Sequence, residues 1–257
     1  MKNYLKKLDQ NICGGYIKRK YQLIYPYLQK YINRKITPLR RGIQKNFVMS
    51  EQLMFFKNAQ FFLQVNRIDG VYLEFGSHEL NTFRMALNTL GQYDKPNNIH
   101  KFIAFDSFEG MPEPQGIDKQ KIWRKSMNST SIEQFYKIMK KDLHRVEAVK
   151  GFYEDTLPKY ELNENDKIAL AYIDCDYYSS TVSVLSFLKN KLSHGTLLAF
   201  DDWDCYYSDP CRGQRLAFSE FTEEVNDQFH FEKFRVIGSG GMSFVCLEKE
   251  KMGQAII

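Results

Sequence analysis

The stretch IALAYIDCDYYSST, residues 168–181, places two carboxylates directly after a run of apolar and aromatic residues. An uncharged run of this length is typical of a buried strand, and Asp174 and Asp176 follow its end. The pattern recurs in TLLAFDD, residues 196–202, which ends at Asp201 and Asp202. Asp174 and Asp201 are separated by one strand–helix–strand step, so the two stretches predict neighbouring parallel strands whose ends bring acids together.

Strand-like and helix-like segments alternate from residue 71 onward, which predicts an α/β fold with a parallel sheet and right-handed crossovers. The last segment, residues 229–249, holds two strands around a Gly-Ser-Gly-Gly turn that is too short for a crossover, so it predicts a C-terminal antiparallel hairpin. Expected strands cover 71–76, 101–107, 146–153, 167–175 and 196–202, and expected helices cover 81–91, 131–143, 179–192 and 215–226.

The beginning of the chain differs in charge from the rest. Residues 1–45 hold twelve Lys and Arg and one acid, Asp9, a net charge of +11; since the whole chain carries +5, the remainder carries −6. We expect a basic helical arm over residues 1–49 and a main domain over residues 50–257 that opens with a helix capped by Ser50. The arm is expected to pack on the main domain, and contact with anionic lipid or an anionic partner is the alternative.

Composition narrows the class of protein. The 257 residues are 43% hydrophobic and 26% charged, which is ordinary for a globular chain. Five cysteines without a Cys-x-x-Cys pair argue against a disulfide framework or a zinc site and favour a reducing cytosol. No apolar run is long enough for a spanning helix, and the N-terminus lacks the apolar core of a secretion signal. We therefore expect a cytoplasmic protein, peripheral at the inner face of the membrane if the arm binds lipid.

The acids that follow the two buried strands indicate a metal site. Carboxylates held close together raise one another's pKa and destabilise the fold unless a cation neutralises them. Sites made only of oxygen ligands suit Mg²⁺, so Asp174, Asp201 and Asp202 are candidate ligands of a divalent ion. The alternative is that these acids cap helices at strand–helix junctions, a role that Asp176 could fill.

The loop after the first expected strand, EFGSHELNTF at residues 74–83, bears on the cofactor. It has a single glycine, Gly76, and an acid, Glu74, at the strand end, so it lacks the Gly-x-Gly-x-x-Gly pattern that receives a pyrophosphate. A cofactor with a positive ammonium and sulfonium and no phosphate suits this loop, and S-adenosylmethionine fits that description. Asp106, at the next strand end, could hold two ribose hydroxyls through its two oxygens. Loop capping is the alternative role for both acids.

Several sequence blocks, in this order, resemble the macrocin O-methyltransferase family from about residue 50 to residue 249. The blocks are VYLEFGS, FIAFDSFEGMPEP, VKGFYEDTLP, YIDCDYYSSTVSVL and LLAFDDWD followed by RGQRLAFSEF. The resemblance implies the seven-stranded, Rossmann-like class I methyltransferase fold. It also implies a metal-dependent O-methyltransferase that uses S-adenosylmethionine and acts on a sugar-containing acceptor, without nucleic acid, and that self-associates.

The same resemblance implies a role for each matching residue. For the cofactor, it implies that Glu74, Gly76 and Ser77 border the methionine end, that Asp106 and Ser107 bind the ribose, and that Asp155 lies beside the adenine. For the metal, it implies that Asp174, Asp201 and Asp202 hold magnesium. It also implies that Asp174 borders the cofactor and accepts the substrate proton, with Asp176 as the second candidate for the proton acceptor. The family's usual second glycine near position 80 is replaced here by Leu80-Asn81. Asn81 is expected to take the positive φ of that turn. Residues 110–130 are expected to form a lid above the cofactor.

Other functions fit parts of the same pattern. A nucleotide-sugar glycosyltransferase could use Asp174 and Asp176 as its metal-binding pair, although the acidic first loop is unfavourable to phosphates. A nucleic-acid methyltransferase would need a basic surface around the site, whereas the main domain is acidic. A catalytically degenerate S-adenosylmethionine-binding protein would not need the intact acidic cluster.

Overall fold

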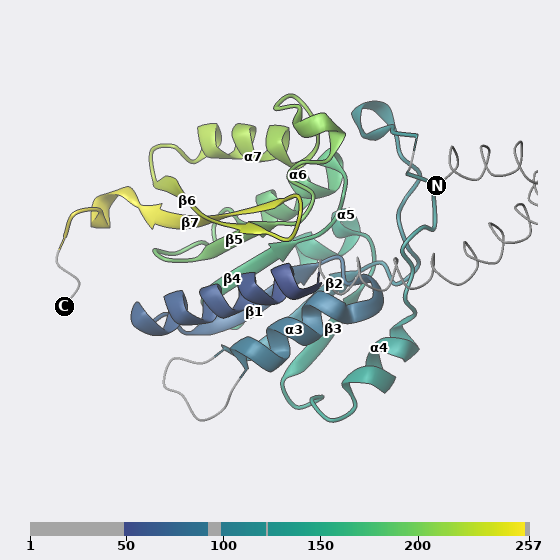
Figure 1. Ribbon diagram of the computed structural model, residues 1–257, viewed down its shortest axis with the longest axis horizontal. Coiled ribbons are helices and arrows are strands. Elements are labelled where there is room, and N and C mark those ends of the chain that lie inside the picture. The colour runs from purple at the N-terminus through teal and green to yellow at the C-terminus, as the bar shows by residue number, and fades with distance from the viewer. Residues whose placement is uncertain (1–48, 92–98, 122, 255–257) are drawn as a thin grey trace, which may run out of the picture. The chain divides into compact units, whose positions relative to one another are not determined.

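A seven-stranded sheet organises the part of the chain that the structure describes, residues 49–91, 99–121 and 123–254 (Figure 1). In this computed structural model the strands stand in the order β3-β2-β1-β4-β5-β7-β6. The expected basic arm lies outside the described residues, apart from Met49.

Five parallel strands and an antiparallel pair make up the sheet, as the sequence predicts. The parallel neighbours are β1 with β2 and β4, β2 with β3, and β4 with β5. β7 runs antiparallel to both β5 and β6, which confirms the C-terminal hairpin. The strands are β1 Gly70–Phe75, β2 Ile99–Asp106, β3 Val146–Lys150, β4 Ile168–Ile173, β5 Leu197–Phe200, β6 Phe229–Ile237 and β7 Gly241–Glu248.

Helices cover both faces of this sheet, so its central strands are buried on both sides (Figure 1). Alternate side chains of β1 enter two cores: Tyr72 joins the helix over residues 49–65 and α3, whereas Leu73 joins α6 and α7. None of the described helices is long and apolar enough to cross a membrane. The labelled helices are α3 Asn81–Leu90, α4 Ile132–Met139, α5 Tyr153–Thr156, α6 Tyr178–Leu188 and α7 Gly213–Glu224.

One expected helix start is wrong. Ser50 lies inside a helix that already includes Met49, so Ser50 is not its N-cap. The start of α6 is capped from a distant segment: the Asp118 carboxylate accepts hydrogen bonds from the backbone N–H groups of Tyr178 at 2.7 Å and Ser179 at 3.4 Å. A cap of this kind stabilises a helix by about 1 kcal/mol, and here it also ties a distant segment to the helix.

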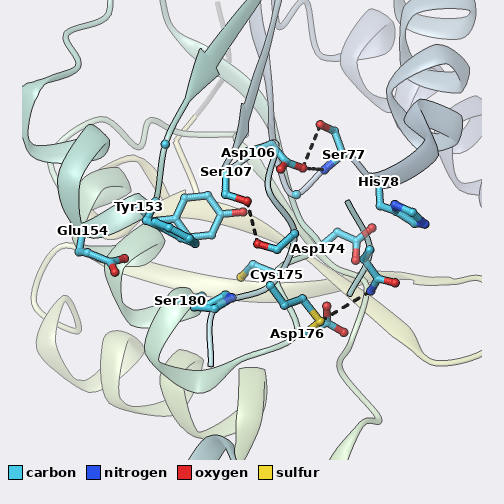
Figure 2. Close-up of a pocket in the computed structure, with 17 residues that line it drawn as sticks. Ser77, His78, Asp106, Ser107, Tyr153, Glu154, Asp174, Cys175, Asp176 and Ser180 are labelled. Carbon is cyan, nitrogen blue, oxygen red and sulfur yellow. Dashed lines mark hydrogen bonds between the residues drawn. The ribbon is translucent and has the colours of Figure 1, made fainter. Parts of the chain in front are cut away.

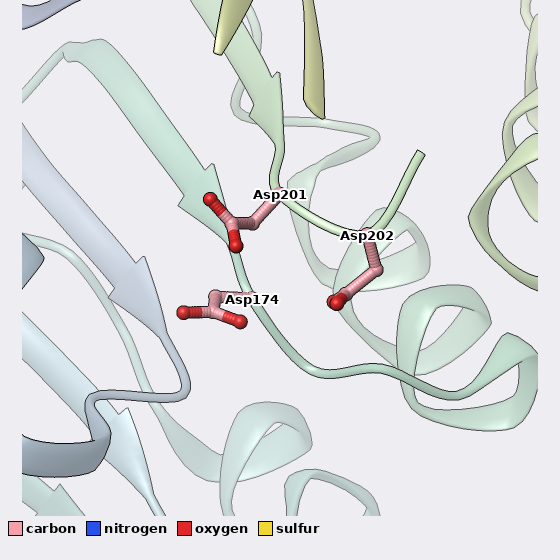
Figure 3. A group of neighbouring side chains, drawn as sticks. All are labelled: Asp174, Asp201 and Asp202. Atoms are coloured by element: carbon pink, nitrogen blue, oxygen red, sulfur yellow. The ribbon is translucent and has the colours of Figure 1, made fainter. Parts of the chain in front are cut away.

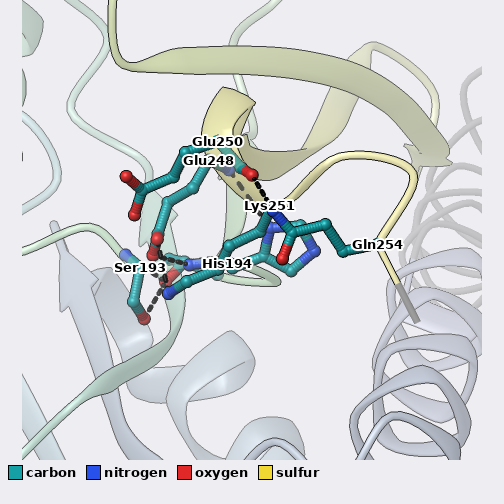
Figure 4. Close-up of polar contacts among 7 residues, drawn as sticks. Ser193, His194, Glu248, Glu250, Lys251 and Gln254 are labelled. Carbon is teal, nitrogen blue, oxygen red and sulfur yellow. Dashed lines mark hydrogen bonds and ion pairs between the residues drawn. The ribbon is translucent and has the colours of Figure 1, made fainter. Parts of the chain in front are cut away.

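Polar contacts join the segment that precedes β5 to the end of β7 (Figure 4). The His194 backbone N–H donates to the Glu248 carboxylate at 2.7 Å, and the Glu248 backbone N–H donates to His194 Nδ1 at 3.2 Å. Lys251 pairs with the same carboxylate at 2.5 Å. These contacts fix the hairpin against the parallel strands, at the edge of the sheet opposite to the carboxyl ends of those strands.

Glu74 is a fully buried acid in the middle of this sheet. Its carboxylate accepts hydrogen bonds from the Tyr72 hydroxyl, on the same strand, and from Thr82 Oγ1 of α3 at 2.9 Å. Burial raises the pKa of Glu74 to about 8, although both hydrogen bonds favour the charged form. Glu74 therefore joins β1 to α3 as a core polar residue.

We predict that the free energy of unfolding of the Glu74→Gln variant increases, relative to that of the unchanged protein, as the pH rises from 5 to 8. Over this interval the folded protein retains the Glu74 proton while the unfolded chain loses it, so the free energy of unfolding of the unchanged protein falls. The amide cannot titrate, and the relative gain at pH 8 should be on the order of a few kcal/mol. Denaturant unfolding at each pH measures it.

The exposed Glu161→Gln is the matched control, because it removes the same acid without burial. A stability difference for Glu74→Gln that does not change with pH would show that Glu74 is ionised throughout.

Candidate functional site

A cavity that is partly open to solvent lies where β1, β2 and β4 end (Figure 2). Six residues that the sequence singled out line it: Gly76, Ser77, Asp106, Ser107, Asp174 and Asp176. The carboxyl ends of parallel strands are where such folds bind ligands.

Asp106 holds two of the cavity loops together. One carboxylate oxygen accepts from the Ser77 backbone N–H at 2.8 Å and from Ser77 Oγ at 3.3 Å, and the other accepts from the Phe108 N–H at 2.7 Å. Burial raises the pKa of Asp106, and these hydrogen bonds oppose that rise. Each oxygen keeps further acceptor capacity, so the carboxylate can receive ligand hydroxyls while it orients the first loop.

Gly76 lets the first loop approach the end of β4 closely. Its φ is +89°, and a Cβ at this position would lie 1.8 Å from the carbonyl oxygen of Asp174. No other residue type fits that approach without moving the backbone. This contact places the Asp174 side chain at the cavity wall.

The turn that follows differs from the expectation for Asn81. The positive φ values fall on Glu79, at 57°, and on Leu80, at 56°, whereas Asn81 has φ −69° and starts α3. The Glu79 N–H donates to Thr130 Oγ1 at 2.9 Å, which helps to hold the unfavourable conformation. Two non-glycine residues thus make the turn without the missing glycine.

Two residues expected at the cofactor lie away from the cavity wall. Glu74 is enclosed in the core, and the exposed Asp155 does not line the cavity, whereas its neighbours Tyr153 and Glu154 do (Figure 2). The block VKGFYEDTLP located the right turn, but α5 is too short for its sequence pattern to show which side faces the cavity. His78 and Ser180 also line the cavity (Figure 2).

Asp174, Asp201 and Asp202 form an acidic triad next to this cavity, with one ligand oxygen of each within 4.8 Å of the others (Figure 3). Asp174 follows β4, and Asp201 and Asp202 follow β5, the neighbouring strand. The Asp201 N–H donates to the Ile173 carbonyl at 3.0 Å, which continues the strand pairing up to the triad. The structure therefore brings together the three acids that the sequence proposed as ligands.

Neighbouring groups orient two members of the triad and leave the third free. Asp201 Oδ1 accepts from the Tyr172 hydroxyl and from Gln52 Nε2 at 3.3 Å. Asp202 Oδ2 accepts from the Asp176 backbone N–H at 2.9 Å. Within the described residues, no group donates a hydrogen bond to the Asp174 carboxylate. One carboxylate is thus unpartnered, and Asp201 keeps its Oδ2 oxygen available.

Burial and mutual repulsion disfavour the charged forms of the acids in and next to the triad. Burial, followed by the charges of Asp201 and Asp202, raises the pKa of Asp174 well above its ordinary value. Burial also raises the pKa of Asp202 and raises that of Asp176 to about 6. No Lys or Arg side chain of the described residues forms an ion pair with the triad. Three close oxygen ligands without a protein cation fit a divalent ion such as Mg²⁺.

Residues 110–130, called the strap below, connect the cavity to the loop after the triad. Gly110, Met111 and Pro112 line the cavity at one end of the strap. Further along, Arg212 donates to the carbonyls of Ile117 at 2.8 Å and Lys119 at 3.1 Å.

Two tyrosines also contact the strap, one from the segment after β4 and one from the segment after β5. The Tyr177 hydroxyl donates to the Pro112 carbonyl at 3.4 Å, and its ring meets that of Trp123 edge to face. The Tyr206 hydroxyl donates to the Asp118 carbonyl at 3.4 Å. The strap therefore passes over the loops that carry the acids.

Comparisons with known proteins agree with this geometry. The macrocin O-methyltransferase (TylF) family matches residues 46–230. A comparison with curated proteins finds no match.

Three solved structures share the fold. The O-methyltransferase NovP is 21% identical, with a TM-score of 0.61, over 77% of this chain and 80% of that chain. The calicheamicin methyltransferase CalS11 is 22% identical, with a TM-score of 0.59, over 95% and 90%. An O-methyltransferase from Bacillus cereus in complex with SAH is 13% identical, with a TM-score of 0.50, over 86% and 97%.

These neighbours confirm the class I methyltransferase fold that the sequence predicts. The family match extends over most of the chain and includes the cavity loops, the triad and the strap. The chain therefore belongs to the macrocin O-methyltransferase family and is an S-adenosylmethionine-dependent O-methyltransferase.

Proposed function

We propose that this O-methyltransferase transfers the methyl group to a hydroxyl of a sugar, and that a divalent ion held by the acidic triad assists the transfer. The observation that carries the proposal is the position of Asp174, which both lines the cavity and belongs to the triad. A methyl donor in the cavity and an acceptor hydroxyl at the triad would then be neighbours.

The cavity walls suit the cofactor. Asp106 is proposed to accept the ribose hydroxyls, with Ser107 beside it, and Gly76 and Ser77 to border the methionine end. Glu154, which lines the cavity, is proposed to border the adenine in place of Asp155, which does not line it. Acidic walls favour a ligand with positive ammonium and sulfonium groups.

The bound groups would supply an electrophilic methyl group and, at the triad, a Lewis acid that lowers the pKa of the acceptor hydroxyl. The chain's own residues do the rest. Asp174 is proposed to accept the hydroxyl proton, because its carboxylate is free of hydrogen bonds from the described residues and faces the cavity. Asp176, which also lines the cavity, is the second choice. The rigid strand ends align donor and acceptor, and that alignment contributes to the rate.

The name of the matching family and the description of one solved structure support a sugar acceptor. The matching family is named for macrocin O-methylation, and a further CalS11 structure is described as a TDP-rhamnose 3′-O-methyltransferase, 20% identical with a TM-score of 0.51. Self-association, a cytoplasmic location and contact of the basic arm with an anionic surface stay proposals.

We expect the unchanged protein to bind S-adenosylhomocysteine and Mn²⁺ in calorimetry, and to methylate nucleotide-linked or other sugars only when a divalent ion is present. Asp202→Asn should weaken Mn²⁺ binding by at least about tenfold, because it removes one of three anionic ligands. Affinity for S-adenosylhomocysteine should change little.

Asp227→Asn is the control. It removes an exposed acid from the turn that follows α7, and this variant should bind Mn²⁺ normally. Full methyl transfer in the presence of a strong chelator would disprove the metal role, and absence of S-adenosylhomocysteine binding would disprove the cofactor assignment.

A second prediction concerns the group that orients Asp201. Gln52 and Tyr172 both donate to Asp201 Oδ1, which fixes the rotation of this carboxylate and leaves Oδ2 without a hydrogen bond from the described residues. Gln52→Ala and Tyr172→Phe should each lower Mn²⁺ affinity by about tenfold, the effect typical of residues that hold a metal ligand. Affinity for S-adenosylhomocysteine should stay the same.

Gln60→Ala, on the same helix, is the matched control, since no described residue bonds its side chain. Equal Mn²⁺ affinity in the Gln52, Tyr172 and Gln60 variants would show that Asp201 needs no such support.

A further inference from the structure

The middle of the strap carries a group of cations that the proposed chemistry does not use. Lys119, Lys121, Arg124 and Lys125 occur within seven residues, and no acid interrupts them. All four are exposed, and none forms an ion pair with an acid of the described residues. They differ in this from Lys101, Lys150 and Lys189, each of which has a carboxylate partner.

These four residues, the strap cations, are fixed beside the reaction site by contacts on both sides. Asp118, directly before them, caps α6 immediately after the Asp176 loop, and Arg212 grips the backbone of Lys119. Trp123, in the middle of the group, contacts Tyr177. The group is therefore not on a free loop that could lie anywhere on the surface.

The sign of this charge does not match the cofactor or the metal. S-adenosylmethionine carries a sulfonium, an ammonium and one carboxylate but no phosphate, and a divalent ion is itself positive. Four exposed cations next to such a site favour an anion. The remaining participant in the reaction is the acceptor.

We propose that the strap cations bind a phosphate or diphosphate group carried by the sugar acceptor. The inference rests on the proposed function and narrows its substrate to phosphate-bearing sugars, with nucleotide-linked sugars as the simplest soluble case. Lys and Arg bind phosphate oxygens through charge-assisted hydrogen bonds. Such binding, remote from the reacting hydroxyl, would orient the sugar with its hydroxyl at the triad.

The test is calorimetric titration of the full-length protein, saturated with S-adenosylhomocysteine, with inorganic pyrophosphate and with UDP in metal-free buffer. The strap variant replaces Lys119, Lys121, Arg124 and Lys125 by Gln. The control variant replaces the exposed Lys137, Lys140, Lys141 and Lys233 by Gln, which removes the same charge elsewhere. A milder pair, Lys121→Gln with Lys125→Gln, serves if the fourfold strap variant does not fold.

We expect both probes to bind the strap variant at least about tenfold more weakly than the unchanged protein, as the loss of several charge-assisted bonds requires. The control variant should change less than about twofold, since distant surface charges are screened by salt. S-adenosylhomocysteine should bind all variants alike.

The inference would be overturned if the strap and control variants lost affinity for the probes equally, or if neither probe bound the unchanged protein. The proposed function would still stand in that case, provided that the unchanged protein binds S-adenosylhomocysteine. If the unchanged protein does not bind S-adenosylhomocysteine, the proposed function and this inference are both refuted. A strap variant that binds pyrophosphate normally but no longer binds phosphatidylglycerol vesicles would assign the cations to a lipid surface instead.

Discussion

Repulsion among the carboxylates at the tips of β4 and β5 is the constraint on which the account depends. Packing explains why these strands are apolar and adjacent, but it does not explain why both end in acids that approach within 4.8 Å. Burial and mutual charge raise the pKa of Asp174 and of Asp202, so the arrangement opposes its own ionisation. The divalent ion that we propose for this site would offset the repulsion by binding all three carboxylates.

The surrounding structure supports that interpretation because it orients the acids rather than neutralising them. Gln52 and Tyr172 both donate to one oxygen of Asp201, and the Asp176 backbone N–H donates to one oxygen of Asp202. Asp174 receives no hydrogen bond from the described residues, although it belongs to the triad and also lines the cavity. Gly76 brings the loop after β1 against the backbone of Asp174, so the cavity and the triad share one residue.

Local patterns in the sequence were sufficient for the sheet and for the triad. Apolar runs that end in Asp174 and in Asp201 specify two buried strands, and their spacing makes the strands neighbours, so the meeting of the acids follows from chain topology. The hairpin at residues 229–249 follows in the same way from the length of its turn. Fold and metal-ligand candidates were therefore predictable without any knowledge of side-chain contacts.

Features that depend on contacts between distant segments were not predictable. Asp118 caps α6 from sixty residues away, and Gln52 reaches Asp201 from the first described helix. Glu74 sits at the expected strand end but points into the core, because Tyr72 and Thr82 offer it hydrogen bonds there. Sequence alone shows which residues occupy a strand end or a turn, whereas tertiary packing decides which of them face the cavity.

The most direct test of the central claim is an anomalous-diffraction map from crystals of the protein grown with S-adenosylhomocysteine and Mn²⁺. We expect one manganese peak coordinated by Asp174, Asp201 and Asp202, beside a cavity that holds S-adenosylhomocysteine. A well-ordered cofactor product with no metal peak at the triad, or with the Asp174 carboxylate turned away from Asp201 and Asp202, would contradict it.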